Sequence, residues 1–293
     1  MFRGTYTALV TPFRDGGIDV PALERLVDGQ IAAGITGLIV NGTTGESPTL
    51  SATEREQNVR VVMERAAGRC QILAGTGTNS TASAIAATQA AERLGVNGAL
   101  VVAPYYNKPS QEGLFRHFEA IAKSTELPIM LYNIPGRCAV DISAATVQRL
   151  AKECGNIVSI KEASGSVDRV SELRGRLPEN FTVLSGDDSL TLPFMSVGAV
   201  GVVSVASNVF PKEVAELVSA FLANDFASAR KSHARLLPIF KDLFIEPNPV
   251  PAKTALGWRG EMSPEVRLPL CEMGEITSQQ LRRTLEVFAH SPV

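Results

Sequence analysis

The chain has 293 residues, of which 45% are hydrophobic and 20% charged, and its formal net charge is −2. This composition is typical of a globular protein with a large core, and the charge balance argues against nucleic-acid or anionic-membrane binding, which need clustered basic residues. No apolar run approaches the roughly 18 residues of a membrane span, and the polar start of the chain does not look like a secretory signal. We therefore expect a cytoplasmic protein without membrane partners.

Eight short apolar segments, each rich in Val, Ile and Leu, recur along the chain and are bounded by Gly, Pro or Asn. They cover residues 5–10, 37–40, 71–75, 98–102, 128–133, 157–161, 182–186 and 199–205. Such segments are typical of buried strands, and amphipathic stretches with helical spacing separate them. Eight strand–helix units of this pitch predict an α/β fold, a (β/α)8 TIM barrel. An open, doubly wound sheet is disfavoured because no glycine-rich dinucleotide turn follows the first segment.

The first two predicted helices carry clear local signals. In the first, Leu23, Leu26 and Val27 fall on one apolar stripe. The second begins with a capping box, in which Ser51 is the cap and Glu54 lies three residues further on. Both patterns indicate helices that pack one face against the strands.

Strand signals cease near residue 224. The sequence therefore predicts a catalytic barrel over residues 1–224 and a C-terminal helical domain, an appendage packed on the barrel, over residues 225–293. The segment EPNPVPAK interrupts the helical pattern of this second part. Its prolines at positions 247, 249 and 251 predict an extended, polyproline-like link.

Lys161 ends the sixth predicted strand, in the segment IVSIKEASG. A lysine at this place either marks the exit of the strand into solvent or performs chemistry at the mouth of the barrel, since barrel active sites lie at the carboxyl ends of the strands. Other polar residues follow other predicted strands at the same end. They are Thr43, Thr44, Tyr105, Tyr106, Tyr132 and Arg137. Each also has a plain structural interpretation, as a turn, as aromatic packing or as a solvated loop charge.

The combination of an amine with phenols and hydroxyls favours Schiff-base chemistry. Lys161 must be neutral to attack a carbonyl carbon, and neutralising an ordinary lysine at pH 7 costs roughly 4.6 kcal/mol. Burial at the barrel mouth offsets much of that cost because it disfavours the ammonium form. A tyrosine linked to a threonine hydroxyl can move the protons. The backbone N–H groups of Thr43 and Thr44 can hold a substrate carboxylate.

A metal site is disfavoured by the sequence. The three histidines, at positions 117, 233 and 290, are far apart, and the only acidic pair after an apolar run is Asp187-Asp188. We interpret that pair as turn, cap or supporting carboxylates. The four cysteines form no C-x-x-C pair and are expected to be reduced thiols.

Seven motifs in order along the chain carry a family resemblance. They are ALVTPF, GTTGES, PYYNKPSQEGL, YNIPGR, IKEASG, LSGDD and EPNPVPAK. Together they resemble the class I, pyruvate-dependent aldolase and lyase family, which includes dihydrodipicolinate synthase and N-acetylneuraminate lyase. The resemblance spans nearly the whole chain and implies the same barrel fold.

The resemblance assigns a role to each residue of the candidate site. Lys161 matches the Schiff-base lysine that condenses with pyruvate, and Tyr132 matches the proton donor and acceptor. Thr44 and Tyr106 match the rest of a proton relay, with Tyr106 reaching in from a neighbouring subunit of a homotetramer, a dimer of dimers. Thr43, Thr44 and Val203 match positions that line pyruvate. Gly186 lies in the matching SGD segment and is also expected to bind substrate.

Arg137 favours one branch of the family. In the synthases a guanidinium at this position receives the carboxylate of aspartate semialdehyde. The resemblance then implies condensation of pyruvate with L-aspartate 4-semialdehyde to 4-hydroxy-tetrahydrodipicolinate, on the diaminopimelate route to lysine, with no separate cofactor. A sister enzyme acting on 2-keto-3-deoxy sugar acids, a non-catalytic barrel and a pyridoxal-phosphate enzyme are the alternatives.

The resemblance also includes a lysine-effector site. Its matching residues are Ser47, Asn79 and Tyr105. However, Ala52, Arg55 and Ser83 stand where regulated members often present histidine and glutamate. We therefore interpret the site as vestigial and predict weak or absent inhibition by lysine.

Overall fold

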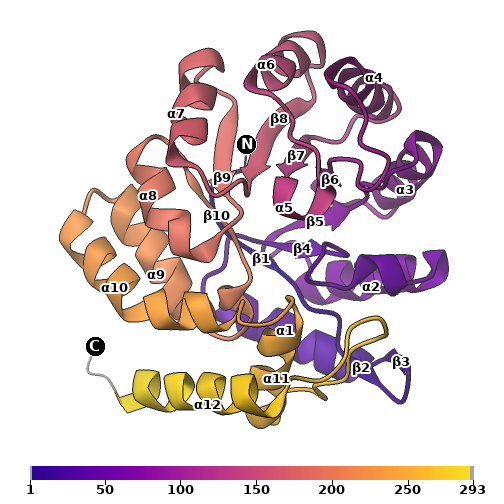
Figure 1. The fold of residues 1–293 in the computed structure, drawn as a ribbon. Coiled ribbons are helices and arrows are strands. Elements are labelled where there is room, and N and C mark those ends of the chain that lie inside the picture. Colours follow the sequence, from indigo (N-terminus) through magenta and orange to yellow (C-terminus); the bar gives the residue numbers. More distant parts are fainter. Residues whose placement is uncertain (1, 291–293) are drawn as a thin grey trace.

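A closed barrel of eight parallel strands lies at the centre of the molecule, in a computed structural model that describes residues 2–290 (Figure 1). Its hydrogen-bonded order is β1-β10-β9-β8-β7-β6-β5-β4. The strands are β1 (Gly4–Ala8), β4 (Gly37–Val40), β5 (Gln71–Gly75), β6 (Gly98–Val102), β7 (Ile129–Asn133), β8 (Ile157–Glu162), β9 (Thr182–Ser185) and β10 (Gly201–Ser204). All eight lie in or at the predicted segments, so the predicted (β/α)8 barrel is confirmed.

Helices follow the strands in turn and cover the outside of the barrel (Figure 1). They are α1 (Val20–Ala32), α2 (Ala52–Ala66), α3 (Thr81–Arg93), α4 (Gln111–Ala122), α6 (Ala144–Glu153), α7 (Val167–Arg176), α8 (Thr191–Ser196) and α9 (Pro211–Leu222). The short helix α5 (Pro135–Cys138) lies in the connection between β7 and α6, inside the ring of outer helices (Figure 1). The predicted stripe of α1 is buried, and Ser51 and Glu54 make both hydrogen bonds of the predicted capping box. Within residues 2–290, no helix has the length and hydropathy that crossing a bilayer would require.

Two apolar clusters divide the core. The larger cluster lies between the strands and the surrounding helices. The smaller cluster fills the interior of the barrel with side chains from several strands, among them Tyr6, Ile39, Leu73, Leu100, Met130, Leu184 and Val203. This division follows from the alternation of side chains along each strand, which sends neighbours to opposite faces.

A short hairpin between β1 and α1 was not predicted. Its strands β2 (Phe13–Arg14) and β3 (Gly17–Ile18) pair in antiparallel fashion. Asp15 and Gly16 connect them, both with positive φ, at 54° and 79°. An Asp-Gly pair is a common signal for this kind of two-residue turn, so the sequence carried the information.

Three helices follow the barrel: α10 (Phe226–Asp242), α11 (Val250–Trp258) and α12 (Glu275–His290). Helix α10 packs against α9, and α12 packs against α10 and α11 (Figure 1). The helical character predicted beyond residue 224 is therefore confirmed, whereas the division into two domains stays a prediction.

The polyproline-like link is a wrong prediction. Residues 245–249 form bends and a turn, in which Val250 N donates to Pro247 O, and Pro251 lies in the first turn of α11. The first turn of a helix accepts proline readily, since its N–H groups have no partner inside the helix. The prolines therefore begin a helix here rather than extend the chain.

Candidate active site

Lys161 and Tyr132 lie side by side on the inner face of the barrel. They are register partners in the parallel pair of β7 and β8. The preceding residues, Leu131 and Ile160, belong to the cluster between strands and helices, so the alternation turns Lys161 and Tyr132 inward. Lys161 Nζ lies 4.1 Å from the centroid of the Tyr132 ring, and Lys161 is only 5% exposed. The interpretation of Lys161 as a strand exit into solvent is therefore wrong.

The Lys161 amine has an unusual electrostatic environment. Within residues 2–290 it takes part in no hydrogen bond or ion pair. Its Nζ instead lies over the aromatic ring of Tyr132. Burial lowers the pKa of Lys161 to about 7, with the Asp188 carboxylate acting to raise it and the Arg137 guanidinium acting to lower it further. A large fraction of the amine is consequently neutral near pH 7, as attack on a carbonyl requires.

Tyr132 is held in its protonated form. Burial raises the pKa of this phenol to about 12, against smaller lowering effects from the Arg137 charge and from hydrogen bonding to the Thr43 side chain. A phenol in this state can donate a proton and take it back through a neighbouring hydroxyl. Thr43 is the hydroxyl that the structure brings to Tyr132.

Thr43 and Thr44 lie in a tight loop after β4. The loop is closed by two backbone hydrogen bonds, from Gly45 N to Gly42 O and from Glu46 N to Thr43 O. Within residues 2–290, the backbone N–H groups of Thr43 and Thr44 donate to no acceptor. Two adjacent N–H groups of this kind form a concave site for an anion such as a carboxylate.

Asn248 completes this end of the site and was not predicted from the sequence as a site residue. Asn248 comes from the turn before α11, and its Nδ2 donates to Thr44 Oγ1 at 2.9 Å. Its carbonyl oxygen is 3.5 Å from Nη2 of Arg137, an exposed residue on α5. The side-chain oxygen Oδ1 of Asn248 is buried without a partner in the described chain. An acceptor is therefore available for a donor on a bound ligand.

Gly186 and Val203 shape the space around Lys161. A Cβ atom on Gly186 would lie 2.7 Å from Ala163 Cβ and 3.0 Å from Lys161 Cε, so only glycine leaves room for the lysine stem. Val203 on β10 belongs to the interior cluster. Both residues were predicted to line the substrate, and the structure gives Gly186 a steric reason for its presence.

Asp188, predicted from the sequence only as a turn, cap or supporting carboxylate, acts electrostatically on Lys161. It lies not on a strand but at the start of the 3-10 helix η2 (Asp188–Leu190). Its carboxylate accepts hydrogen bonds from Ser204 Oγ and from the backbone N–H groups of Val205 and Ala206. Burial nevertheless raises the pKa of Asp188 to about 6. Near pH 7 this carboxylate is mostly ionised and favours the ammonium form of Lys161.

Tyr106 does not reach the site of its own chain. It is 90% exposed and has a positive φ of 76°. The predicted effector residues lie in neighbouring loops: Tyr105 is half-buried, and Asn79 O accepts a hydrogen bond from Asn107 Nδ2 at 2.9 Å. Ser47 is half-buried at the start of the 3-10 helix η1 (Ser47–Thr49).

No group of three or more metal-binding side chains occurs among residues 2–290. Asp187 accepts a hydrogen bond from Ser189 N and caps η2, which agrees with its interpretation as a capping carboxylate. The groups that the structure gathers around Lys161 are its amine, the Tyr132 phenol, the hydroxyls of Thr43 and Thr44 and the backbone N–H groups of their loop.

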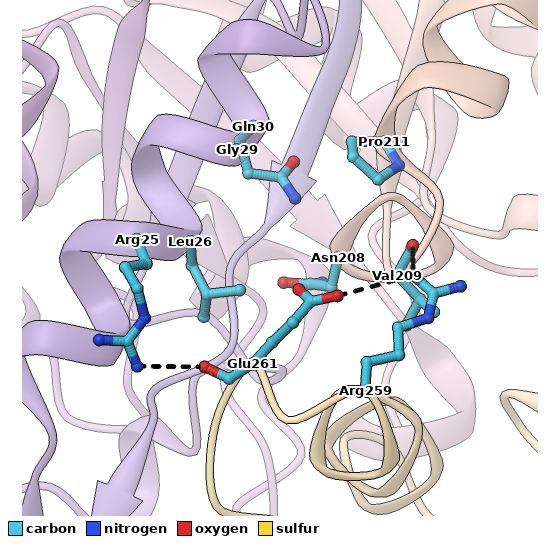
Figure 2. A pocket seen from close by; sticks show the side chains of 9 residues that line it. All are labelled: Arg25, Leu26, Gly29, Gln30, Asn208, Val209, Pro211, Arg259 and Glu261. Carbon is cyan, nitrogen blue, oxygen red and sulfur yellow. Dashed lines mark hydrogen bonds and ion pairs between the residues drawn. The ribbon is translucent and has the colours of Figure 1, made fainter.

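A pocket of about 380 Å³ lies elsewhere, between α1, the start of α9 and the end of α11. Nine residues line it (Figure 2): Arg25, Leu26, Gly29, Gln30, Asn208, Val209, Pro211, Arg259 and Glu261. Its two buried polar side chains are already paired, since Gln30 Nε2 donates to Ser207 O and Asn208 Nδ2 donates to Ala8 O. This pocket contains none of the groups described above.

Comparisons with known proteins agree over nearly the whole chain. The model of the dihydrodipicolinate synthetase family matches residues 1–288. The 4-hydroxy-tetrahydrodipicolinate synthase of Endomicrobium trichonymphae is 48% identical over 288 residues, which are 98% of this chain and 99% of that protein. The structure of the same enzyme from the methanotroph Methylacidiphilum fumariolicum SolV has a TM-score of 0.98 and 56% identity, and covers 99% of this chain and 96% of that one.

A second similar structure contains pyruvate. It is the chloride-inhibited dihydrodipicolinate synthase from Acinetobacter baumannii complexed with pyruvate, with a TM-score of 0.96 and 42% identity, and the match covers 99% of both chains.

Proposed function

The chain belongs to the dihydrodipicolinate synthetase family, and we infer from this membership and from the site that it acts as a 4-hydroxy-tetrahydrodipicolinate synthase. It is a lyase of the class I aldolase type that condenses pyruvate with L-aspartate 4-semialdehyde. The observation that carries the mechanism is the buried, unpaired amine of Lys161 against the ring of Tyr132.

Catalysis begins at the Lys161 amine. Its neutral form attacks the ketone carbon of pyruvate, and loss of water leaves an imine between Nζ and the former carbonyl carbon. The pyruvate carboxylate is held by the free backbone N–H groups of Thr43 and Thr44. This assignment is supported by the dihydrodipicolinate synthase that is 42% identical to this chain and forms a complex with pyruvate.

Tyr132 transfers the protons in the next steps. Through the Thr43 hydroxyl it relays the proton that leaves the methyl group, and the imine becomes an enamine. The enamine carbon attacks the aldehyde carbon of aspartate semialdehyde, and the new alkoxide takes a proton from the relay. The amine of this second substrate then attacks the imine carbon and expels Lys161, which closes the ring. One water is lost over the whole reaction.

Arg137 selects the second substrate. It is exposed at the mouth, where its Nη2 donates to Asn248 O, and its planar guanidinium is suited to binding a carboxylate. A sugar-acid aldolase of the same family would share Lys161 and Tyr132 but not the need for this cation. Assays of aspartate semialdehyde and of sugar aldehydes with pyruvate distinguish the two activities.

No separate cofactor enters this mechanism, because the imine itself accepts the electron pair when the methyl proton leaves. We place the enzyme in the cytoplasm, where the diaminopimelate route to lysine would use its product. A pyridoxal-phosphate enzyme would instead be coloured after purification.

Tyr106 supports the proposal of a homotetramer, a dimer of dimers. A phenol that is 90% exposed in one chain can join the relay of Tyr132 and the hydroxyls of Thr43 and Thr44 only in the site of a neighbouring subunit. A monomeric variant exists among the solved dihydrodipicolinate synthases, so assembly is to be measured by sedimentation. A tetramer whose Tyr106→Phe variant loses activity supports the role, and a fully active monomer contradicts it.

The lysine-effector site at Ser47, Asn79 and Tyr105 stays a prediction. A solved relative from Cyanidioschyzon merolae, 42% identical, has lysine bound. Because Ala52 and Arg55 lack the groups expected near such a ligand, we propose weak or absent inhibition. Strong inhibition by sub-millimolar lysine would contradict this.

The direct test is reductive trapping. The protein is incubated with pyruvate and borohydride, and mass spectrometry of its peptides locates the adduct. We expect the added mass on the peptide that contains Lys161 and on no other lysine. An adduct elsewhere, or turnover with none formed, would overturn the mechanism.

A further inference from the structure

A buried ion pair joins the Thr43–Thr44 loop to the C-terminal region. Lys253 Nζ donates to Glu46 Oε1 at 2.7 Å, and the two side chains are 0% and 1% exposed. Glu46 follows Thr44 by two residues, whereas Lys253 lies on α11. Breaking a buried pair of this kind leaves an uncompensated charge, so the two segments are tightly coupled.

The second carboxylate oxygen of Glu46 is also paired. Glu46 Oε2 accepts a hydrogen bond from the backbone N–H of Arg267 at 3.0 Å. The guanidinium of Arg267 pairs with Glu54, while Lys253 Nζ and the Arg267 guanidinium lie 4.2 and 4.3 Å from the centroid of the Phe13 ring. The carboxylate is thus held by partners that themselves have fixed positions.

The loop needs such support. Glu46 has a left-handed backbone conformation with φ of 55°, which is unfavourable for a residue with a Cβ atom and persists only where surrounding contacts impose it. Thr44 is fixed from the same side, since its hydroxyl accepts from Asn248 Nδ2. The partners of Thr44 and Glu46, at positions 248, 253 and 267, belong to the region beyond the barrel, whereas Thr11 holds the loop from the barrel side by donating to Gly45 O.

We propose that the Glu46–Lys253 ion pair is a positioning device for the pyruvate carboxylate. It fixes the loop whose free N–H groups at Thr43 and Thr44 receive that carboxylate, so that the C-terminal region completes the active site. This inference rests on the proposed function, because it assigns pyruvate to the loop. Glu46 and Lys253 are positioning residues and do not touch the reacting atoms.

The test uses a neutral double variant of the full-length chain, Glu46→Gln/Lys253→Met. The introduced glutamine can still accept from Arg267 N and the introduced methionine fills the space of the lysine stem, and such replacement of a buried pair is often tolerated by the fold. We expect a Tm close to that of the wild type, a KM for pyruvate raised about tenfold, as for one lost hydrogen bond to a charged group, and kcat changed by less than about twofold. The single variants Glu46→Gln and Lys253→Met should show the same rise in KM wherever they fold.

Leu281→Ala is the matched control. Leu281 is fully buried in α12, so this variant loosens the same C-terminal region while leaving the ion pair intact. It should lower Tm and leave the KM for pyruvate within about twofold of the wild type, since a cavity acts mainly on stability.

Two results would overturn the inference: a double variant with the wild-type KM for pyruvate, or a Leu281→Ala variant whose KM rises as much as that of the double variant. Trapping with borohydride separates these from failure of the proposed function. If wild-type protein forms the Lys161 adduct and the double variant has the wild-type KM for pyruvate, only the inference is wrong. If wild-type protein forms no adduct, the proposed function and the inference both fall.

Discussion

Two buried lysines of this chain, Lys161 and Lys253, each lie against an aromatic ring but differ in their ion-pair partner. They are 5% and 0% exposed, and each amine lies about 4 Å from the centroid of an aromatic ring, that of Tyr132 or Phe13. However, Lys253 has the Glu46 carboxylate at 2.7 Å, whereas Lys161 has no ion-pair or hydrogen-bond partner in the described chain.

The comparison shows that burial alone does not make a lysine reactive. Burial lowers the pKa of Lys253 as well, but the Glu46 carboxylate in contact with it acts in the opposite direction and favours the ammonium form. Without that contact the neutral amine becomes accessible near pH 7, as for Lys161. Lys253 therefore stabilises the structure, whereas Lys161 performs the chemistry.

The largest expected effect is on turnover. Lys161→Met removes the amine and keeps an apolar side chain of similar length, so catalysis should fall by a factor on the order of 10³ or more. Steady-state assay with both substrates measures it. A melting temperature at or above that of the wild type would show that the loss is chemical, whereas a variant that keeps a tenth of the activity would contradict the role of Lys161.

The same substitution at the other lysine should act on stability. Lys253→Met leaves the Glu46 carboxylate buried without its counter-charge, and we expect the free energy of unfolding to fall by about 3–5 kcal/mol. Denaturation in urea measures this against Lys161→Met, which removes no partner from any group. Equal stabilities of the two variants would show that the comparison is wrong.

The fold was predictable because its signals are local. Eight apolar segments at a regular pitch indicated the barrel, and the capping box of α2 was predicted residue by residue. The prolines of residues 247–251 were misinterpreted, because proline suits both an extended segment and the first turn of a helix, and only packing decides between them.

The site was only partly predictable, for a related reason. Lys161, Tyr132 and the Thr43–Thr44 loop follow barrel strands, so the fold itself directs attention to them. Asn248 and Lys253 approach the same loop from more than 200 residues away in the sequence. No periodicity or spacing reports such a contact, and the environment of Asp188 likewise depended on three donors that only the folded chain supplies.

A smaller effect is expected from crowding the reactive lysine. Gly186→Ala would place a Cβ atom 3.0 Å from Lys161 Cε and push the amine away from Tyr132. Because misplacement of a reacting group is costly, the rate of adduct formation with pyruvate should fall about 10-fold to 100-fold. Gly175→Ala is the control, since a Cβ atom there meets nothing within 4 Å. Similar rates for the two variants would exclude a steric role for Gly186.

The finest test of the comparison is the pH dependence of adduct formation. Only the neutral amine reacts, so the rate should rise with pH and reach half its plateau near pH 7, the pKa of Lys161. The rate of adduct formation, measured by borohydride trapping after timed incubations at a series of pH values, gives this midpoint. A midpoint near the value of a solvated lysine, about 10.4, would show that the site does not perturb the amine.

Charge substitutions should move that midpoint in opposite directions. Asp188→Asn removes a carboxylate that raises the pKa of Lys161, so the midpoint should fall; Arg137→Gln removes a cation that lowers it, so the midpoint should rise. Arg137 is exposed and Asp188 is buried, so added salt should screen the interaction of Arg137 with the amine more than that of Asp188. At high salt the Arg137→Gln shift should therefore shrink while the Asp188→Asn shift persists. Shifts of the same sign would mean that hydration, rather than these two charges, governs the amine.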